Sequence, residues 1–569
     1  MGRVNRGWYS AAMFQLPTAP RISGGLLRSV VRATRAEPVR RTLASLMRKD
    51  LGIDAALALP ASVREEQPLS PLPLRARDAH PRESAELDLP APPEALASAA
   101  TWHARYESGE TTPVEVVERA IAEAKRLASA KPTMGCFSAL DEQRALLDAE
   151  ASAARWAKGA PLGPLDGVVV PIKEEVDIDG HGYRLGTSFV PPRADAVDGT
   201  APARLRAAGA ILLGHTFMTE MGMSPLGSNV QRDMPRNAHA IDRVAGGSST
   251  GSAIAVASGL CPVALGSDGG GSVRIPACFN GLFGIKPTFG RISRHGDGFG
   301  GTVDHLGPIG ASTRDLAIFL EACGGEDPHD PLTHGSPDIA PGSLVAALGR
   351  GVKGLRIGVL GREIDAATGA VQGACRDALR ALEEDGAVLV DLDLPLVEHA
   401  PGMGYLTIGI ETYASLLEAR RDHWELMGPD LQLLMRVVST FDAGGYLDAQ
   451  ALRAALRRQV GEALEDVDLL ALPTTAAIAP EVTALDLSGG FADTPALRDA
   501  CRFAFLGNLT GLPASTAPVG SGDDAMPVGL QLMGDAFDEA TVLAATAHLE
   551  RAGVATVREP RVPVYPLGK

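Results

Sequence analysis

The chain of 569 residues is poor in cysteine and in positive charge, and it lacks long apolar runs. Its six cysteines lie far apart without CxxC spacing, which argues against a disulfide scaffold or a zinc knuckle and favours a reducing, cytoplasmic compartment. A net charge of −16 argues against a nucleic-acid partner, because phosphates require a basic face. No apolar run approaches the roughly 18–20 residues that a membrane span needs.

Metal and cofactor motifs are also missing. There is no HExxH and no clustered His/Asp set, so we expect no metal. The Gly/Ser-rich GGSSTGSA lacks the lysine of a P-loop, and no GxGxxG with an acidic partner is present, so we expect no cofactor. Aromatic residues make up only 4% against 45% apolar residues, and alanine and glycine therefore fill much of what is a large core.

The two ends of the chain differ in composition. Residues 1–50 are rich in arginine and poor in acid, a composition shared by transit peptides and membrane-surface helices. We favour a helical extension that docks on the main domain. Residues 57–93 are rich in proline and are predicted to form an extended linker or an arm that wraps around the main domain. We therefore divide the chain into an extension, residues 1–90, and a main domain, residues 91–569.

Short apolar runs alternate with helical patterns along the main domain. This alternation predicts an α/β fold with a largely parallel, covered sheet. Thr112, Pro113 and Glu115 form a helix start with a capping box, and residues 411–467 have helical periodicity. The expected strands are 167–173, 210–216, 262–269, 355–360, 387–395 and 468–474, with helices at 198–209 and 371–386.

The stretch from Gly246 to Ser272 reads GGSSTGSAIAVASGLCPVALGSDGGGS, two clusters of small residues around a helical run. A serine nucleophile needs a base within hydrogen-bond reach. None of the twelve histidines lies in a triad context, and no GxSxG elbow is present. Lys173 ends an apolar strand, and burial in such a place can leave a lysine neutral and basic.

Three glycines, Gly269, Gly270 and Gly271, directly precede Ser272. Successive amides without side chains can turn toward one point and form an oxyanion hole. Plainer alternatives exist: a solvated surface position for Lys173, a turn position for Ser272, and helix N-caps for the two serines of GGSST.

In order and spacing, these motifs resemble the amidase signature hydrolases. The resemblance spans about residues 90–565 and is carried by PIKEEVDIDG, RNAHAIDRVAGGSS, GGSSTGSAIAVASG, GSDGGGSVRIPACFNGLFGIKPTFGRIS, DHLGP, FLGNLTGLPASTAPVG and PVGLQLMGDAFDEATVL. Lys173 stands 75 positions before Ser248, which stands 24 before Ser272. The resemblance implies a large mixed sheet covered by helices on both faces, an α/β/α layer fold.

The resemblance also implies the site. Ser272 is the expected nucleophile, Ser248 the bridging serine after a cis Gly247–Ser248 peptide, and Lys173 the base. The amides of Gly269, Gly270 and Gly271, with that of Ser272, are the expected oxyanion hole. Supporting roles fall to Ser249, Asp268 and Arg274, although an ordinary buried ion pair is an equal interpretation of Asp268 and Arg274. Thr250 stands where the family usually has glycine.

We therefore expect an amidase that cleaves a small-molecule, non-peptide amide through an acyl-enzyme. An esterase or carbamate hydrolase with the same triad is the alternative; the glutaminase subunit of a tRNA-dependent amidotransferase and a non-catalytic scaffold rank lower. A homodimer is common among members of the family. We expect the pocket to come from residues 218–223, 404–436 and 474–494, whose apolar content indicates an uncharged, partly hydrophobic substrate group.

Overall fold

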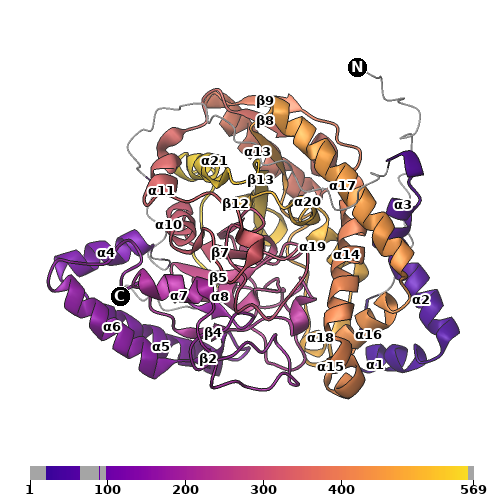
Figure 1. Ribbon diagram of the computed structural model, residues 1–569, viewed down its shortest axis with the longest axis horizontal. Coiled ribbons are helices and arrows are strands. Elements are labelled where there is room, and N and C mark those ends of the chain that lie inside the picture. The colour runs from indigo at the N-terminus through magenta and orange to yellow at the C-terminus, as the bar shows by residue number, and fades with distance from the viewer. Residues whose placement is uncertain (1–20, 64–88, 90–95, 97, 562–569) are drawn as a thin grey trace.

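A computed structural model describes residues 21–63, 89, 96 and 98–561, and an eleven-stranded sheet runs through it (Figure 1). The strand order across the sheet is β2 (Phe137–Leu140), β4 (Gly214–Thr216), β3 (Ile172–Lys173), β5 (Val263–Ser267), β7 (Leu306–Gly310), β6 (Phe283–Lys286), β12 (Ala514–Ser521), β13 (Pro527–Met533), β10 (Leu469–Pro473), β8 (Arg356–Val359) and β9 (Val388–Asp391).

The sheet is mixed, as the family resemblance implied. Six of its ten strand pairings are antiparallel, so the expectation of a largely parallel sheet was wrong. Alternation of strands and helices holds around β3, β4 and β5 and again around β8, β9 and β10. The antiparallel centre comes from two pairs, β6 with β7 and β12 with β13, and each pair is joined by a loop without a crossover α-helix.

Helices surround the sheet in Figure 1. The helix predicted to start at Thr112 begins there, with both hydrogen bonds of the capping box. The region predicted helical, residues 411–467, is helical almost throughout. The main-domain helices are α4 (Ala99–Ser108), α5 (Pro113–Ser129), α6 (Glu142–Trp156), α7 (Thr200–Ala207), α8 (Thr250–Ala257), α9 (Arg274–Phe279), α10 (Thr313–Cys323), α11 (Ser343–Ala347), α12 (Gly361–Asp365), α13 (Gly369–Glu384), α14 (Ala400–Ser415), α15 (Leu417–Asp422), α16 (Pro429–Val438), α17 (Ala443–Asp466), α18 (Ala484–Gly489), α19 (Thr494–Cys501), α20 (Phe505–Thr510) and α21 (Glu539–Arg551).

The described part of the N-terminal extension is helical and docks on the main domain, as expected. It forms α1 (Gly24–Ala33), α2 (Glu37–Asp50) and α3 (Ile53–Leu57). The short strand β1 (Ile22–Ser23) pairs antiparallel with β11 (Phe491–Ala492), and the three helices pack against α14, α16 and α18. Residues 1–20 and nearly all of the expected linker lie outside the described residues.

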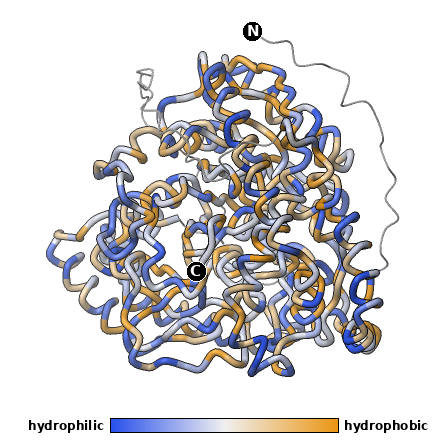
Figure 2. Tube along the Cα trace, turned by 45° about the vertical axis from the view of Figure 1, so that its right-hand side comes forward, coloured by the Kyte–Doolittle hydropathy of each residue, from blue (hydrophilic) through white to orange (hydrophobic). Residues whose placement is uncertain are grey.

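Apolar side chains from most of the sheet and its covering helices form one continuous core. Hydrophobic and hydrophilic segments alternate along the outer helices in Figure 2, because such helices bury one face only. All six cysteines are buried and free. Within the described ranges, no helix combines the length and the apolar character needed to cross a bilayer.

Candidate active site

The turn before α8 is tightly packed and holds Ser248. The Gly247–Ser248 peptide is cis, as the family resemblance implied. Gly246 has a φ of +78°, and a Cβ there would lie 2.9 Å from the Cα of Pro276. A Cβ on Gly247 would lie 2.6 Å from a backbone oxygen. Both positions therefore require glycine, and the turn presents Ser248, which is almost fully buried, to the end of β3.

Lys173 ends β3 and its side chain is 0% exposed. Its Nζ donates to Ser248 Oγ at 2.8 Å and to Ser267 Oγ at 2.5 Å. It also lies 2.7 Å from Glu175 Oε2. The structure thus brings Lys173 and Ser248 together as predicted, and it excludes the alternative of a solvated lysine.

Glu175 and Ser267 are members of this network that sequence reasoning missed. The Ser267 hydroxyl donates to Glu175 Oε2 at 2.7 Å, so Ser267 and Glu175 together hold the Lys173 side chain in place. Glu175 follows Lys173 by two positions in the run KEE, and the turn after β3, closed by a hydrogen bond from the Val176 N–H to the Lys173 carbonyl, brings its carboxylate back to the lysine.

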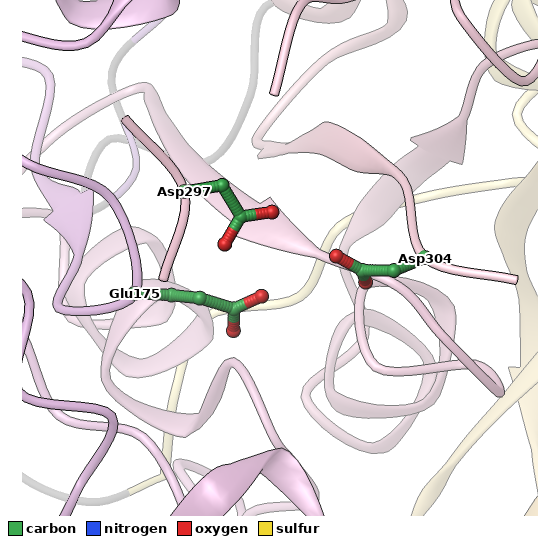
Figure 3. A group of neighbouring side chains, drawn as sticks. All are labelled: Glu175, Asp297 and Asp304. Carbon is green, nitrogen blue, oxygen red and sulfur yellow. The ribbon is translucent and has the colours of Figure 1, made fainter. Parts of the chain in front are cut away.

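Two further acids lie beside Glu175. Carboxylate oxygens of Glu175, Asp297 and Asp304 all lie within 4.8 Å of one another, and the three side chains point toward a common centre (Figure 3). Burial, and then the Glu175 charge, raises the pKa of Asp304 to about 7 and that of Asp297 well above its usual range. Carboxylate oxygens can hold a hard cation; the expectation of no metal stays a prediction.

One backbone amide in the loop before Ser272 already has a hydrogen-bond acceptor within the protein. The Gly271 N–H donates to Asp268 Oδ1 at 2.7 Å. The family resemblance placed this amide in the oxyanion hole, but here it is directed at a carboxylate. The amides of Gly269, Gly270 and Ser272 have no hydrogen-bond acceptor among the described residues, and these three remain free to face an oxyanion.

Asp268 and Arg274 form a fully buried ion pair at 2.8 Å. Burial alone would raise the pKa of Asp268, but the Arg274 guanidinium and the Asn508 amide hold it well below its usual range. Arg274 also donates to Gln531 Oε1 and Asn508 Oδ1. Asp268 and Arg274 therefore fit both sequence interpretations. They form an ordinary buried ion pair, and Asp268 also fixes the Gly271 amide and so supports the loop.

Ser249 connects the two serine-bearing loops, namely the turn that holds Ser248 and the loop from Ser267 to Ser272. Its hydroxyl donates to the carbonyl of Ser267 at 3.1 Å and accepts from the Ser267 amide at 3.2 Å. It makes no capping hydrogen bond at the start of α8, so the helix-cap interpretation was wrong for its side chain. Thr250, the departure from the family pattern, donates to the carbonyl of Gly246 at 2.8 Å and steadies the same turn.

Ser272, 9% exposed, lies where two pockets meet. The first, here called the acidic pocket, measures about 390 Å³ and is lined by Ser248, Ser267, Glu175, Asp304 and Glu411 among others. Ser248 and Ser272 both face it, although among the described residues no hydrogen bond joins their hydroxyls.

The second, here called the apolar pocket, measures about 700 Å³. It is lined by Met47, Leu51, Ile53, Gly222, Met223, Pro225, Gly270, Ser272, Tyr405, Ile408, Gly409, Leu434, Val437, Val438, Phe441, Leu497, Cys501 and Phe505.

The predicted pocket segments are partly right. Residues 218–223 and 404–436 line both pockets. Residues 474–494 do not reach either of them, although 491–494 line a neighbouring hollow. Sequence reasoning missed Met47, Leu51 and Ile53, which come from the N-terminal extension and have no motif to mark them.

Comparison with known proteins agrees with this geometry. Residues 115–543 match the family model described as Amidase. The chain is 34% identical to a fatty acid amide hydrolase of Arabidopsis thaliana over 459 residues, 79% of this chain and 75% of that protein. It is 34% identical to one subunit of a glutamyl-tRNA(Gln) amidotransferase of Roseiflexus sp. over 487 residues, 80% of this chain and 96% of that one.

Solved structures give the same result. The fold is similar to that of a bacterial aryl acylamidase described as an amidase signature enzyme, with a TM-score of 0.71 and 27% identity over 81% of this chain and 97% of that chain. The family match covers most of the main domain, including every residue of the two serine-bearing loops. From its sequence, its mixed sheet and these similarities, the chain belongs to the amidase signature family and is an amidase.

Proposed function

We propose that the chain hydrolyses the carbon–nitrogen bond of small amides with Ser272 as nucleophile, Ser248 as bridge and Lys173 as base. The observation that carries this proposal is the buried contact of 2.8 Å between Lys173 Nζ and Ser248 Oγ, beside a pocket that Ser272 also lines. A buried amine next to a hydroxyl is a combination that activates a serine without histidine.

The reaction has two halves. In the first, Ser272 Oγ attacks the amide carbon, its proton passes through Ser248 to Lys173, and the carbon–nitrogen bond breaks as the proton returns through Ser248 to the leaving amine. In the second, water adds to the acyl-enzyme and passes a proton through Ser248 to Lys173. The bond between the acyl carbon and Ser272 Oγ then breaks, the proton returns through Ser248 to Ser272 Oγ, and a carboxylic acid leaves. Each half returns Lys173 and Ser248 to their starting protonation.

Backbone amides stabilise the charge that develops on the carbonyl oxygen. The free amides of Gly269, Gly270 and Ser272 supply the donors, while Asp268 holds the Gly271 amide and so fixes the curve of the loop. Removing one such donor costs about a hundred- to a thousandfold in rate in a serine hydrolase, so a loop held by a buried ion pair matters to turnover.

The apolar pocket supports an apolar acyl group. It adjoins Ser272 and Gly270, its size is that of small-molecule sites, and apolar side chains dominate its lining. The relatives named fatty acid amide hydrolase and aryl acylamidase fit such a substrate. We place the whole reaction in the domain proposed for residues 91–569, with part of the acyl pocket supplied by the extension.

A second function has one observation in its favour. The amidotransferase relative is 34% identical over nearly its whole length, so a glutaminase role with a partner chain is the competing function. The N-terminal extension, which contributes Met47, Leu51 and Ile53 to the apolar pocket, is not expected of such a protein. Esters and carbamates can use the same three residues, so they belong in any substrate panel.

The test compares amides with an active-site probe. Wild-type protein should hydrolyse octanoyl anilide and carry a fluorophosphonate label on Ser272. Ser272→Ala should lose both while unfolding like the wild type, and Lys173→Ala should lose turnover at every pH. Hydrolysis of glutamine but of no apolar amide would favour the competing function, and an unlabelled wild-type protein would contradict the triad.

Cytoplasmic location, the absence of a cofactor and a homodimeric state remain part of the proposal. Six free, buried cysteines support a reducing compartment.

A further inference from the structure

The leaving-group side of Ser272 is defined by the proton relay. If Ser248 returns the proton to the departing nitrogen, that nitrogen must lie on the Ser248 side of the nucleophile. Ser248 lines the acidic pocket and is not part of the apolar one. On the proposed function, therefore, the acyl half of the substrate lies in the apolar pocket and the amine half enters the acidic pocket.

Negative charge in the acidic pocket is only partly compensated. Glu175, Asp297 and Asp304 form the cluster of Figure 3. Lys173 pairs with Glu175 at 2.7 Å, and Arg294 Nη1 lies 3.8 Å from Asp304 Oδ2. Within the described ranges, Lys173 and Arg294 are the basic groups in contact with these three acids, so even with both of them protonated one carboxyl group has no counter-charge.

Asp304 is the acid with the weakest compensation on the pocket side. Its side chain is buried, only 7% of the residue is exposed, and it lines the acidic pocket. Its Oδ2 is buried and has no hydrogen-bond donor among the described residues, and the same is true of Asp297 Oδ2. Buried carboxylate oxygens without donors are costly, so an oxygen of this kind beside a substrate pocket marks the place of a missing donor.

We infer that the acidic pocket binds a leaving amine that carries a second, cationic ammonium group, with Asp304 as its main partner. An ammonium group supplies the two things that the cluster lacks, a positive charge and N–H donors. Without it, the buried cluster holds a proton in place of a counter-ion, as the pKa of Asp304 near 7 indicates. The substrate class is therefore the apolar acyl amide of a diamine or of another amine with a free ammonium.

An ammonium fits this pocket better than a bare metal ion. A divalent ion at the centre of the three carboxylates would lie close to Lys173 Nζ, which is 2.7 Å from Glu175 Oε2, and would oppose the proton transfer to Lys173 that the proposed reaction requires. An ammonium at the end of a leaving group instead approaches through the pocket, where Glu411 also lies. No lysine, arginine or histidine is among the described residues that line the acidic pocket to oppose it.

The experiment uses two amides that differ in one group. Octanoyl-ethylenediamine carries a free ammonium, and octanoyl-propylamine places a methyl group at the same position. We expect the wild-type protein to show a kcat/KM about ten- to a hundredfold higher for the first amide, the range of a hydrogen bond to a charged group. Asp304→Asn should reduce this preference to about twofold or less, because it keeps the shape and removes the charge.

Two further variants secure the interpretation. Asp297→Asn should also weaken the preference, and it replaces Asp304→Asn if that protein does not fold. Asp338→Asn removes an exposed acid outside the pocket and should keep the full preference, which separates a local effect from net charge.

The outcomes separate the inference from the function on which it rests. Equal turnover of both amides by the wild type would overturn the cationic subsite and leave the amidase proposal intact. Turnover of neither, with Ser272 unlabelled by fluorophosphonate, would overturn both. Titration of Mg²⁺ or Zn²⁺ alone into the protein should give no heat of binding; stoichiometric binding that Asp304→Asn abolishes would instead identify a metal site.

Discussion

Two buried aspartates, Asp268 and Asp304, lie beside the loop of Gly269 to Ser272, and their pKa values are shifted in opposite directions. Asp268 is fully buried and accepts hydrogen bonds from Arg274, Asn508 and the Gly271 amide, so its pKa lies well below the usual range. Asp304 is nearly as buried, has a distant arginine and an unpartnered oxygen, and its pKa is raised to about 7.

The contrast shows how the protein separates scaffold from site. A buried charge whose every lone pair is occupied fixes a loop and has no capacity for a ligand. A buried acid that lacks donors lowers stability and keeps that capacity, a compromise typical of functional sites. Four predictions, in decreasing order of expected effect, test whether this distinction holds.

The largest effect is expected from making Asp268 resemble Asp304. Arg274→Met removes the guanidinium and leaves a buried, uncompensated carboxylate, which costs about 3–5 kcal/mol. Urea unfolding should show this loss, and activity should fall because Arg274 no longer holds Asp268, the acceptor of the Gly271 amide, in position. Gln531→Ala removes an uncharged hydrogen-bond partner of Arg274 and serves as a milder comparison. An unchanged unfolding free energy for Arg274→Met would refute the scaffold role of the pair.

Glu175→Gln tests the acid that links the cluster to Lys173. Loss of one hydrogen bond to a charged group, about 1.5–3 kcal/mol, predicts a ten- to hundredfold lower kcat/KM. Glu175→Asp should recover part of the rate, because it restores a carboxylate near Lys173. Wild-type kcat/KM for Glu175→Gln would show that Glu175 has only a packing role.

Asp304→Asn should change stability in a pH-dependent way. The folded-state pKa of about 7 exceeds the ordinary value of 3.8, so the folded protein binds this proton more tightly than the unfolded chain does. That stabilisation is complete below about pH 4 and is lost as pH rises through about 7. Asparagine does not ionise, so the variant should become progressively more stable relative to wild type as the pH rises from about 5 to about 8.

Thermal unfolding across this pH range gives the measurement, with Asp338→Asn as the exposed control. A constant difference between Asp304→Asn and wild type would show that Asp304 ionises normally and would remove the contrast with Asp268.

The smallest effect is expected for Ser267→Ala. The Ser267 hydroxyl connects Lys173 and Glu175, but the direct ion pair between those two remains when it is lost. One neutral hydroxyl is worth about 0.5–1.5 kcal/mol, which corresponds to a three- to tenfold lower kcat/KM. Ser515→Ala, at a buried serine outside both pockets, should have no effect on the rate. A loss as large as that of Glu175→Gln would place Ser267 in the proton relay itself.

Local sequence signals explain what could be predicted. Lys173, Ser248 and Ser272 occur in motifs whose order and spacing are specific, and the capping box at Thr112 is a purely local pattern. The structure places the lysine against the first serine and both serines at one pocket. The cis peptide and the buried pair of Asp268 and Arg274 followed from the same motifs.

What could not be predicted depends on contacts between distant parts of the chain. Asp297 and Asp304 meet Glu175 only because the loop before β7 folds over the end of β3, more than 120 positions away in sequence. Strands β12 and β13 pair through the centre of the sheet, and periodicity does not reveal the direction of such pairing. Met47, Leu51 and Ile53 carry no motif, so only their packing shows that they line a pocket.

The short pairing of β1 with β11 has a practical consequence. It fastens the first described helices to the domain, and those helices form one wall of the cavity beside the nucleophile. A recombinant enzyme that lacks residues 1–57 would keep all three reactive side chains but open that wall to water. Such a shortened protein should still react with small acetyl reagents and discriminate poorly among long acyl groups. It should also self-associate through the apolar surface that the missing helices would otherwise cover.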